Sequence, residues 1–564
     1  MSLASWLFGR LCRLPAPITR DIASEPLRIP MRDGAELLAD RYYPRHAAHP
    51  PTVLIRSCYG RSAFKVFATL FAERGMQVVM QSCRGTCGSQ GTFRPFFDEQ
   101  NDGEDTVEWI ERQQWFSGKL ALWGLSYLGN TAWAVAGSRV APKVDALGLH
   151  VTLTNFRDRT YAFDGFTLIS CFGWTLTMVD ILRTDGSSVL APLLGRLLAR
   201  CRTKALSKQA AAIIPLRKAD RLITPEGVSW WQDWMDHAER GDPWWDATNY
   251  GAAAQAIPPA VMVAGWYDIF LPFQLRDFEA AQHAGRGVRI TIGPWTHVAL
   301  PGLAESLRQS IALFQEKLGI GSKATGNPRV CLLLMGANEW REYPSWPPPN
   351  TAPQTFNLHP SGVISADPPA LESESTFVYD PAQPTPALHG AALDIPKGSG
   401  DMAELEARSD VLVFTTKTVA SDVAAIGPVS AEIFLRSNTK HTDVYLCLCD
   451  VTSDGRSTNV CDGYRRLRPG HSLGQNAIGS DDARKVNVEF WPTAYRFRRG
   501  HRIRIIVASG AHPRSARNLG SGEPLGDATT MIVAHQHILH GPEHPSSVML
   551  TVVPAQKSTA EVES

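Results

Sequence analysis

Over the first 150 residues, short apolar runs alternate with segments whose apolar positions recur at helical spacing. The apolar runs span residues 53–56, 77–80, 120–123 and 146–149. Strands that are buried on both faces of a parallel sheet have this composition. A segment with helical spacing at 104–111 lies between two of the runs, and residues 27–37 read as a hairpin that turns at Asp33-Gly34. The alternation predicts a βαβ series, and therefore an α/β domain over residues 1–154.

The pattern changes twice further along the chain. Residues 155–250 are rich in Leu, Ala, Arg and Trp at helical spacing, which predicts a helical insertion. The α/β pattern resumes over 251–343 and ends at a Pro-rich linker, residues 344–350. Beyond the linker, residues 351–554 contain short strand-like runs separated by Gly, Pro, Asp and Asn, which predicts an all-β domain.

Composition and charge narrow the functional classes. The chain has 564 residues, 44% hydrophobic and 20% charged, with a net charge of +1, as expected for a globular protein of several domains. We expect neither a nucleic-acid nor a membrane partner, because no strong charge imbalance or long apolar span is present. The 10 cysteines show neither disulfide nor zinc spacing, and the N-terminus makes a poor signal peptide. A cytoplasmic protein without a metal site is the expectation.

The segment 119–129 carries the first candidate chemistry. It reads as an apolar strand, a sharp turn at Ser126 and a following helix, which is the geometry of a nucleophile elbow. Gly124 stands two residues before the serine, but the second glycine of the general G-x-S-x-G motif is displaced to Gly129, with Leu128 in its place. On this segment alone, a strand-to-helix turn with a helix-capping serine is an equally good interpretation.

Two later segments favour catalysis. An apolar run that begins at Ala260 ends at Asp268, and a second run from Val288 ends, after a Gly-Pro turn, at His297. Catalytic groups of open α/β sheets follow the carboxyl ends of the strands, and a serine elbow requires an acid and then a histidine downstream. Ser126, Asp268 and His297 occur in that order, so we predict that they form a catalytic triad.

With these residues the chain resembles the cocaine esterase (CocE/NonD) hydrolases, which are related to X-Pro dipeptidyl-peptidases and α-amino-acid ester hydrolases. The motifs that carry the resemblance are GLSYLG, GWYDIF, GPWTH, RSCYGR, DGEDTVEWI, WWQDWMDH, LLLMGANEWR, RSDVLVFTT and EHPS. The resemblance covers nearly the whole chain, from about residue 29 to residue 554. The resemblance implies an α/β-hydrolase domain with an inserted helical cap, followed by a C-terminal all-β jelly roll. One departure is Ser82, which stands where the family usually carries an aspartate. Any ion pair that this aspartate makes with a neighbour in the family is therefore in doubt here.

The resemblance also implies roles for residues around the triad. RSCYGR places the family's oxyanion tyrosine at Tyr59, and the backbone N–H of Tyr127, which follows the serine, would be the second oxyanion donor. Phe270 matches an aromatic residue that lines the acyl pocket. Trp174, an aromatic residue of the insertion, is a further candidate for this pocket, although aromatic residues at helical spacing more often pack in the core.

We therefore predict a serine hydrolase that cleaves a small carboxylic ester with an apolar or aromatic acyl group through an acyl-enzyme on Ser126. It would use no cofactor and no metal. A homo-oligomer is left open. The alternatives are an α-amino-acid ester hydrolase or β-lactam acylase, an X-Pro peptidase, and, outside the enzymes, a carbohydrate-binding protein with a silent hydrolase domain.

Overall fold

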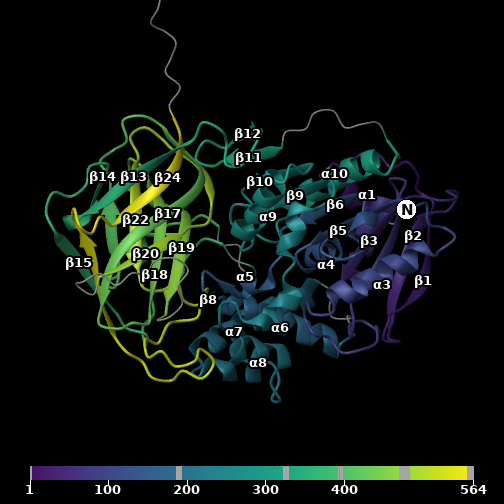
Figure 1. Cartoon of the computed structure of the whole chain (residues 1–564), viewed down its shortest axis with the longest axis horizontal. Helices are drawn as coiled ribbons and strands as arrows, with labels where there is room; N and C mark the ends of the chain where they lie inside the picture. Colours follow the sequence, from purple (N-terminus) through teal and green to yellow (C-terminus); the bar gives the residue numbers. More distant parts are fainter. Residues whose placement is uncertain are drawn as a thin grey trace, which may run out of the picture. The chain divides into compact units, whose positions relative to one another are not determined.

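The computed structural model forms two compact units (Figure 1). The first unit comprises Met1–Thr160, Cys171–Ala212 and Lys218–Arg329, and the second comprises Tyr161–Ser170, Ile213–Arg217 and Val330–Ser564. The structure describes residues 3–185, 193–321, 329–391, 393, 398–468 and 483–554. Part of the predicted helical insertion, residues 186–192, lies outside the described residues.

The first unit is built on a mixed sheet with the order β1-β2-β4-β3-β5-β6-β9-β10. The strands are β1 (Ile22–Pro30), β2 (Glu36–Pro44), β3 (Thr52–Ser57), β4 (Gln77–Ser82), β5 (Leu120–Leu125), β6 (Ala146–His150), β9 (Ala260–Gly265) and β10 (Val288–Gly293). β1 and β2 form the predicted antiparallel hairpin, and the strands from β4 to β10 pair in parallel. This sheet and the all-β second unit confirm the predicted fold class, an α/β-hydrolase domain followed by an all-β domain.

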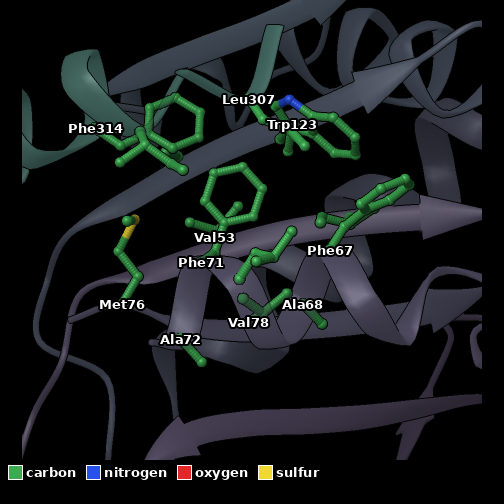
Figure 2. Close-up of a cluster of buried hydrophobic side chains, with 14 of the residues drawn as sticks. Val53, Phe67, Ala68, Phe71, Ala72, Met76, Val78, Trp123, Leu307 and Phe314 are labelled. Atoms are coloured by element: carbon green, nitrogen blue, oxygen red, sulfur yellow. The ribbon is translucent and has the colours of Figure 1, made fainter. Parts of the chain in front are cut away.

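Helices pack on the sheet and enclose its core. They are α1 (Leu3–Leu11), α2 (Lys65–Ala72), α3 (Glu99–Glu111), α4 (Tyr127–Ala136), α9 (Leu271–His283) and α10 (Leu300–Lys317). Figure 2 shows the cluster in which Phe71 of α2 lies between Trp123 of β5 and Phe314 of α10. Its ring centroid is 5.6 Å from that of Trp123 and 5.8 Å from that of Phe314. These large rings anchor β5 three residues before Ser126, so the core fixes the strand that presents the serine.

The insertion is helical, as its spacing predicts. It contains α5 (Phe156–Thr160), α6 (Leu168–Arg183), α7 (Leu193–Ala212) and α8 (Ser229–Asp236), followed by short 3-10 helices at Pro243–Thr248 and Gly251–Gln255. α6 and α8 are joined by a hydrogen bond from Trp230 Nε1 to Thr175 Oγ1, 3.2 Å long, and by the packing of Phe172 against Trp231. Between α5 and α6, the two-residue strands β7 (Tyr161–Ala162) and β8 (Gly165–Phe166) belong to the second unit.

Among the described residues from Val330 onward, the second unit is all-β apart from the short helix α11 (Ala403–Glu406) and the 3-10 turn Pro360–Gly362. Its strands are β11 (Val330–Leu334), β12 (Glu339–Tyr343), β13 (Ala352–His359), β14 (Val363–Ser365), β15 (Ser373–Tyr379), β16 (Leu412–Thr415), β17 (Val423–Ser437), β18 (Thr442–Val451), β19 (Ser457–Leu467), β20 (Arg484–Glu489), β21 (Thr493–Phe497), β22 (Arg502–Ala508), β23 (Ala534–His540) and β24 (Ser547–Val553). Cys447 and Cys449 lie on one face of β18 with their sulfur atoms 3.7 Å apart, buried in the core. Among the described helices of either unit, none combines the length and the apolar composition that a membrane crossing needs.

Candidate active site

Ser126 lies in the sharp turn between β5 and α4. Its backbone has φ 54° and ψ −121°, in the left-handed half of conformational space that non-glycine residues rarely occupy. Strain of this kind persists where the surrounding structure enforces it, and it is characteristic of a nucleophile elbow. The turn is held by a 2.9 Å hydrogen bond from the Ser126 N–H to the carbonyl of His150, at the end of β6.

Two glycines make this turn possible through close approach. A Cβ on Gly124 would lie 2.1 Å from the carbonyl oxygen of Leu128, and a Cβ on Gly129 would lie 2.6 Å from Cβ of Thr152. No side chain fits at either position without moving backbone or core. Because the tight contact on this side of α4 falls at Gly129, Leu128 can occupy the position where the general motif has its second glycine. The displaced glycine is therefore explained by packing.

The acid and the histidine follow adjacent parallel strands. Asp268 lies just beyond β9, and His297 lies just beyond β10. Nε2 of His297 is 2.8 Å from Oγ of Ser126, and Nδ1 is 2.6 Å from Oδ2 of Asp268. Oδ1 of Asp268 accepts a 2.7 Å hydrogen bond from the N–H of Phe270. Because an ionised carboxylate only accepts hydrogen bonds, the imidazole donates from Nδ1 and accepts the serine hydroxyl proton at Nε2. The structure thus brings the three predicted residues into one hydrogen-bonded chain.

The two predicted oxyanion residues lie next to each other. Tyr59 is on the loop after β3, and its ring meets that of Tyr127 edge-on with centroids 6.3 Å apart. Tyr127 is the first residue of α4, where a backbone N–H has no acceptor within the helix. Burial raises the pKa of the Tyr59 hydroxyl well above its ordinary value. Tyr59 therefore keeps its proton near neutral pH and can act as a hydrogen-bond donor.

Trp174 of α6 contacts both of these tyrosines. Its indole Nε1–H donates to the hydroxyl oxygen of Tyr59 over 2.9 Å, and its ring stacks on that of Tyr127 with an interplanar angle of 7°. The sequence indicates Trp174 only as a candidate for the acyl pocket, and the hydrogen bond to Tyr59 has no sequence signal. An indole N–H can only donate, so the oxygen of Tyr59 is the acceptor and its own proton is left to another partner.

Phe270, the other pocket candidate, packs directly on the histidine. Its ring meets the imidazole of His297 edge-on, with centroids 5.0 Å apart and an interplanar angle of 87°. Phe270 is 7% exposed, and it directly precedes α9. The side chain of Phe270 therefore packs on His297, while its backbone N–H donates to the carboxylate of Asp268.

Sequence reasoning missed His150, which is buried under the site. Its carbonyl accepts from Ser126, and its Nδ1 is 3.2 Å from the carbonyl of Val263. Burial lowers the pKa of His150 to about 4, so the ring is neutral at physiological pH. A neutral ring adds no second positive charge beside His297. The position of His150 at the end of β6 could have drawn attention, but nothing in the sequence distinguishes it among 16 histidines.

The structure also shows what surrounds Ser82, where the family usually has an aspartate. Oγ of Ser82 accepts a 3.2 Å hydrogen bond from Arg61 Nη1. The same guanidinium lies 3.3 Å from Oδ2 of Asp40 through its Nε. Asp40 on β2 thus supplies the negative charge for Arg61, and the serine keeps a neutral hydrogen bond to it.

Asp277 of α9 is a buried carboxyl that fixes the start of the insertion. It accepts from the Thr154 N–H over 3.0 Å and from the Thr154 hydroxyl over 2.7 Å. Burial raises the pKa of Asp277 to about 7. Between about pH 4 and pH 7 the folded protein therefore holds a proton that the unfolded chain has lost, so stability falls as the pH rises through this window.

We expect Asp277→Asn to remove this loss of stability with rising pH, because an amide carries no charge to desolvate. The gain over the wild type should be small at pH 4.5 and should grow to at most about 4 kcal/mol at pH 8. Thermal unfolding of both proteins across this pH range, followed by circular dichroism, measures the difference. Parallel pH profiles for the two proteins would show that Asp277 ionises normally in the fold.

Comparison with known proteins is consistent with the class of protein that this sheet and serine elbow define, the serine hydrolases. The chain matches the family model of X-Pro dipeptidyl-peptidases (S15 family) over residues 33–299 and that of the X-Pro dipeptidyl-peptidase C-terminal non-catalytic domain over residues 322–549. It is 31% identical to cocaine esterase from Rhodococcus sp. (strain MB1 Bresler), with 93% of this chain and 97% of that protein covered. The chain therefore belongs to the cocaine esterase family of serine hydrolases.

Solved structures share the whole fold. An α-amino acid ester hydrolase matches with a TM-score of 0.78 at 19% identity, covering 96% of this chain and 98% of that one. A CocE/NonD family hydrolase from Staphylococcus aureus matches with a TM-score of 0.69 at 15% identity, covering 95% of this chain and 94% of that one. Both likenesses show the architecture. Within the described residues, no group of three His, Cys, Asp or Glu side chains is arranged to hold a metal ion.

Proposed function

We propose that the protein hydrolyses carboxylic esters through an acyl-enzyme on Ser126. The observation that carries this proposal is the hydrogen-bonded chain from Ser126 through His297 to Asp268, with links of 2.8 and 2.6 Å. An isolated serine hydroxyl is a weak nucleophile and needs an adjacent base that is itself held in orientation. His297 is such a base, and Asp268 is the group that orients it.

The reaction has two stages. In the first, Oγ of Ser126 bonds to the acyl carbon while its proton passes to Nε2 of His297. The tetrahedral intermediate then expels the alcohol, which takes that proton, and leaves an ester on the serine. In the second, water attacks this ester, His297 accepts a proton from the water, and the proton returns to Oγ as the acid leaves. Asp268 stabilises the imidazolium in both stages without taking its proton.

The negative oxygen of each tetrahedral intermediate needs donors in place beforehand. We assign this role to the backbone N–H of Tyr127 and to the hydroxyl of Tyr59. The assignment of Tyr59 is supported by the indole of Trp174, which occupies an acceptor position on the phenol oxygen and does not use the phenol proton. Because Trp174 belongs to α6, we further propose that the insertion acts as a cap that completes the site.

The substrate class follows from the walls of the site. Phe270 packs against His297, and Trp174 stacks on Tyr127, so aromatic side chains border the proposed reacting groups. Such walls favour an apolar or aromatic acyl group. The similarity to a protein named cocaine esterase supports an ester as the scissile group.

The match to the S15 family model favours a second candidate, cleavage of an amide with a free amino group nearby. A substrate ammonium would require a carboxylate in the site. Asp268 is the carboxylate of the hydrogen-bonded chain, and it already accepts hydrogen bonds from His297 and from the N–H of Phe270. We therefore rank amide cleavage second.

A fluorophosphonate probe followed by a substrate panel tests the proposal. The probe should label the wild type on Ser126, as located by peptide mass spectrometry. Aryl and alkyl esters of benzoate and acetate should then be hydrolysed faster than X-Pro p-nitroanilides and α-amino-acid amides. An unlabelled protein would favour a silent hydrolase domain, and faster amide cleavage would favour the peptidase alternative.

A Phe270→Ala variant tests the proposed acyl pocket. Removing the ring should weaken the transition state for benzoyl esters by about 1–3 kcal/mol and leave acetyl esters nearly unchanged, because only the larger acyl group reaches the ring. The values of kcat/KM for both ester classes measure this difference. Equal losses for the two classes would mean that Phe270 serves only to support Asp268 and His297.

A further inference from the structure

A buried charged pair lies behind the serine elbow, and the proposed reaction does not use it. Glu99, the first residue of α3, is 4% exposed, and Arg56 of β3 is 2% exposed. Nη2 of Arg56 is 2.9 Å from Oε2 of Glu99, and Nη1 donates to the backbone carbonyl of Glu99 over 2.6 Å. The desolvation of two charges offsets most of their attraction, so stability alone is a weak reason for such a pair. The position of the pair, next to the residue that follows Ser126, offers a better reason.

The carboxylate of Glu99 holds the residue that follows the nucleophile. Its Oε1 accepts a 2.7 Å hydrogen bond from the hydroxyl of Tyr127. The hydroxyl oxygen in turn accepts from the N–H of Phe96 over 3.0 Å. Burial raises the pKa of Tyr127 well above its ordinary value, so the hydroxyl remains a donor to Glu99. The side chain of Tyr127 is therefore tethered at its hydroxyl, next to the backbone N–H that we assign to the oxyanion hole.

The same pair reaches the strand that leads to the other oxyanion donor. Arg56 precedes Tyr59 by three residues, and its Nε donates to Oε1 of Gln81 on β4 over 2.8 Å. The carbonyl of Arg56 accepts from the hydroxyl of Thr131, on α4, over 3.3 Å. Glu99 and Arg56 thus join the end of β3, which carries Tyr59, to the first turn of α4, which begins at Tyr127.

We propose that Glu99 is a positioning residue for the oxyanion hole. It fixes the backbone N–H of Tyr127 through the tyrosine hydroxyl and sets its spacing from Tyr59 through Arg56. This inference rests on the proposed ester hydrolysis, in which both donors bind the tetrahedral intermediate. Donors of this kind act only when their geometry is set before the reaction, so loosening one of them lowers turnover more than it lowers substrate binding.

A Tyr127→Phe variant removes the hydroxyl and leaves the ring and the backbone N–H. We expect kcat for p-nitrophenyl esters to fall about 10-fold, with KM changed by less than about 2-fold. The inhibition constant of phenylboronic acid should rise about 10-fold, since its serine adduct places an oxygen in the oxyanion hole.

Tyr464→Phe is the matched control. Tyr464 of β19 is also a buried tyrosine whose hydroxyl donates to a carboxylate, Asp443, that is paired with an arginine, Arg466, but this group belongs to the second unit. It should lose thermal stability to a similar extent and keep its kcat. Equal kinetic losses in both variants, or a loss in KM alone for Tyr127→Phe, would overturn the positioning role.

A double-mutant cycle tests whether Glu99 acts through Tyr127. Glu99→Gln keeps an oxygen that can accept from the tyrosine but removes the charge that faces Arg56, so a smaller fall in kcat is expected. The losses in the double variant should be less than additive, because both changes act on the bond between Glu99 and Tyr127, and fully additive losses would overturn the coupling. If the wild type fails to react with a fluorophosphonate, the proposed function fails and this inference with it. If it reacts and Tyr127→Phe keeps wild-type kinetics, this inference alone fails.

Discussion

Ser126→Ala is expected to lower kcat for p-nitrophenyl ester hydrolysis by at least about 10⁴-fold. The variant removes the atom that forms the acyl-enzyme in the proposed reaction, and losses of this order or larger follow removal of a triad serine in other hydrolases. The fold should remain intact, because the elbow is held by the backbone bond from Ser126 to His150 and by the glycines at 124 and 129. Residual turnover and the melting temperature should be measured on the same preparation.

Ser138→Ala provides the control for that experiment. Ser138 lies just beyond the other end of α4, and its hydroxyl donates to the carbonyl of Val135 over 2.7 Å. Ser138 is also buried. None of the described hydrogen bonds joins it to His297. Its turnover should match the wild type. Turnover near the wild-type level in Ser126→Ala would show that another group is the nucleophile.

The sequence predicts those parts of the molecule that depend on neighbours along the chain. The hairpin at Asp33-Gly34, the buried parallel strands and the helical insertion all follow from local composition and spacing. Asp268 and His297 could be placed beside Ser126 because the ends of parallel strands meet at one edge of a sheet. The distances between the three residues needed the structure.

Contacts between distant segments could not be predicted. Trp174 and Tyr59 are 115 positions apart, and their hydrogen bond depends on how the insertion packs. Glu99 lies in a polar, acidic segment, yet it is buried because Arg56 and Tyr127 surround it. Burial of a charge is decided by its partners, and these come from other elements of the fold.

Strand lengths in the second unit show the same limit. One of the strand-like runs expected beyond the linker covers residues 431–435, and Gly427-Pro428, a pair typical of turns, precedes it. In the structure β17 runs from Val423 to Ser437, and a register shift between Ala425 and Val429 absorbs the glycine and the proline. A bulge and a turn have the same local composition, and pairing with the neighbouring strands decides between them.

Tyr59→Phe is expected to produce the second largest effect, a fall in kcat of about 100-fold or more with a smaller change in KM. The change removes one hydroxyl. The ring remains packed against Phe64 and Tyr127, so the loop after β3 should keep its position. The loss follows from the role of the phenol proton, which would bind the substrate oxygen only after that oxygen has become negative.

Trp174→Phe separates this role from packing. It keeps an aromatic ring over Tyr127 but removes the N–H that donates to the oxygen of Tyr59, so the hydroxyl survives without its orienting partner. Its kcat should fall less than that of Tyr59→Phe, and combining the two changes should add little to the loss in Tyr59→Phe, because the indole acts through the phenol. Steady-state kinetics of the two single variants and the double variant on one benzoyl ester measure all three. If Tyr59→Phe changes KM alone, Tyr59 binds the substrate in its ground state, and the oxyanion depends on Tyr127 and a donor other than the phenol.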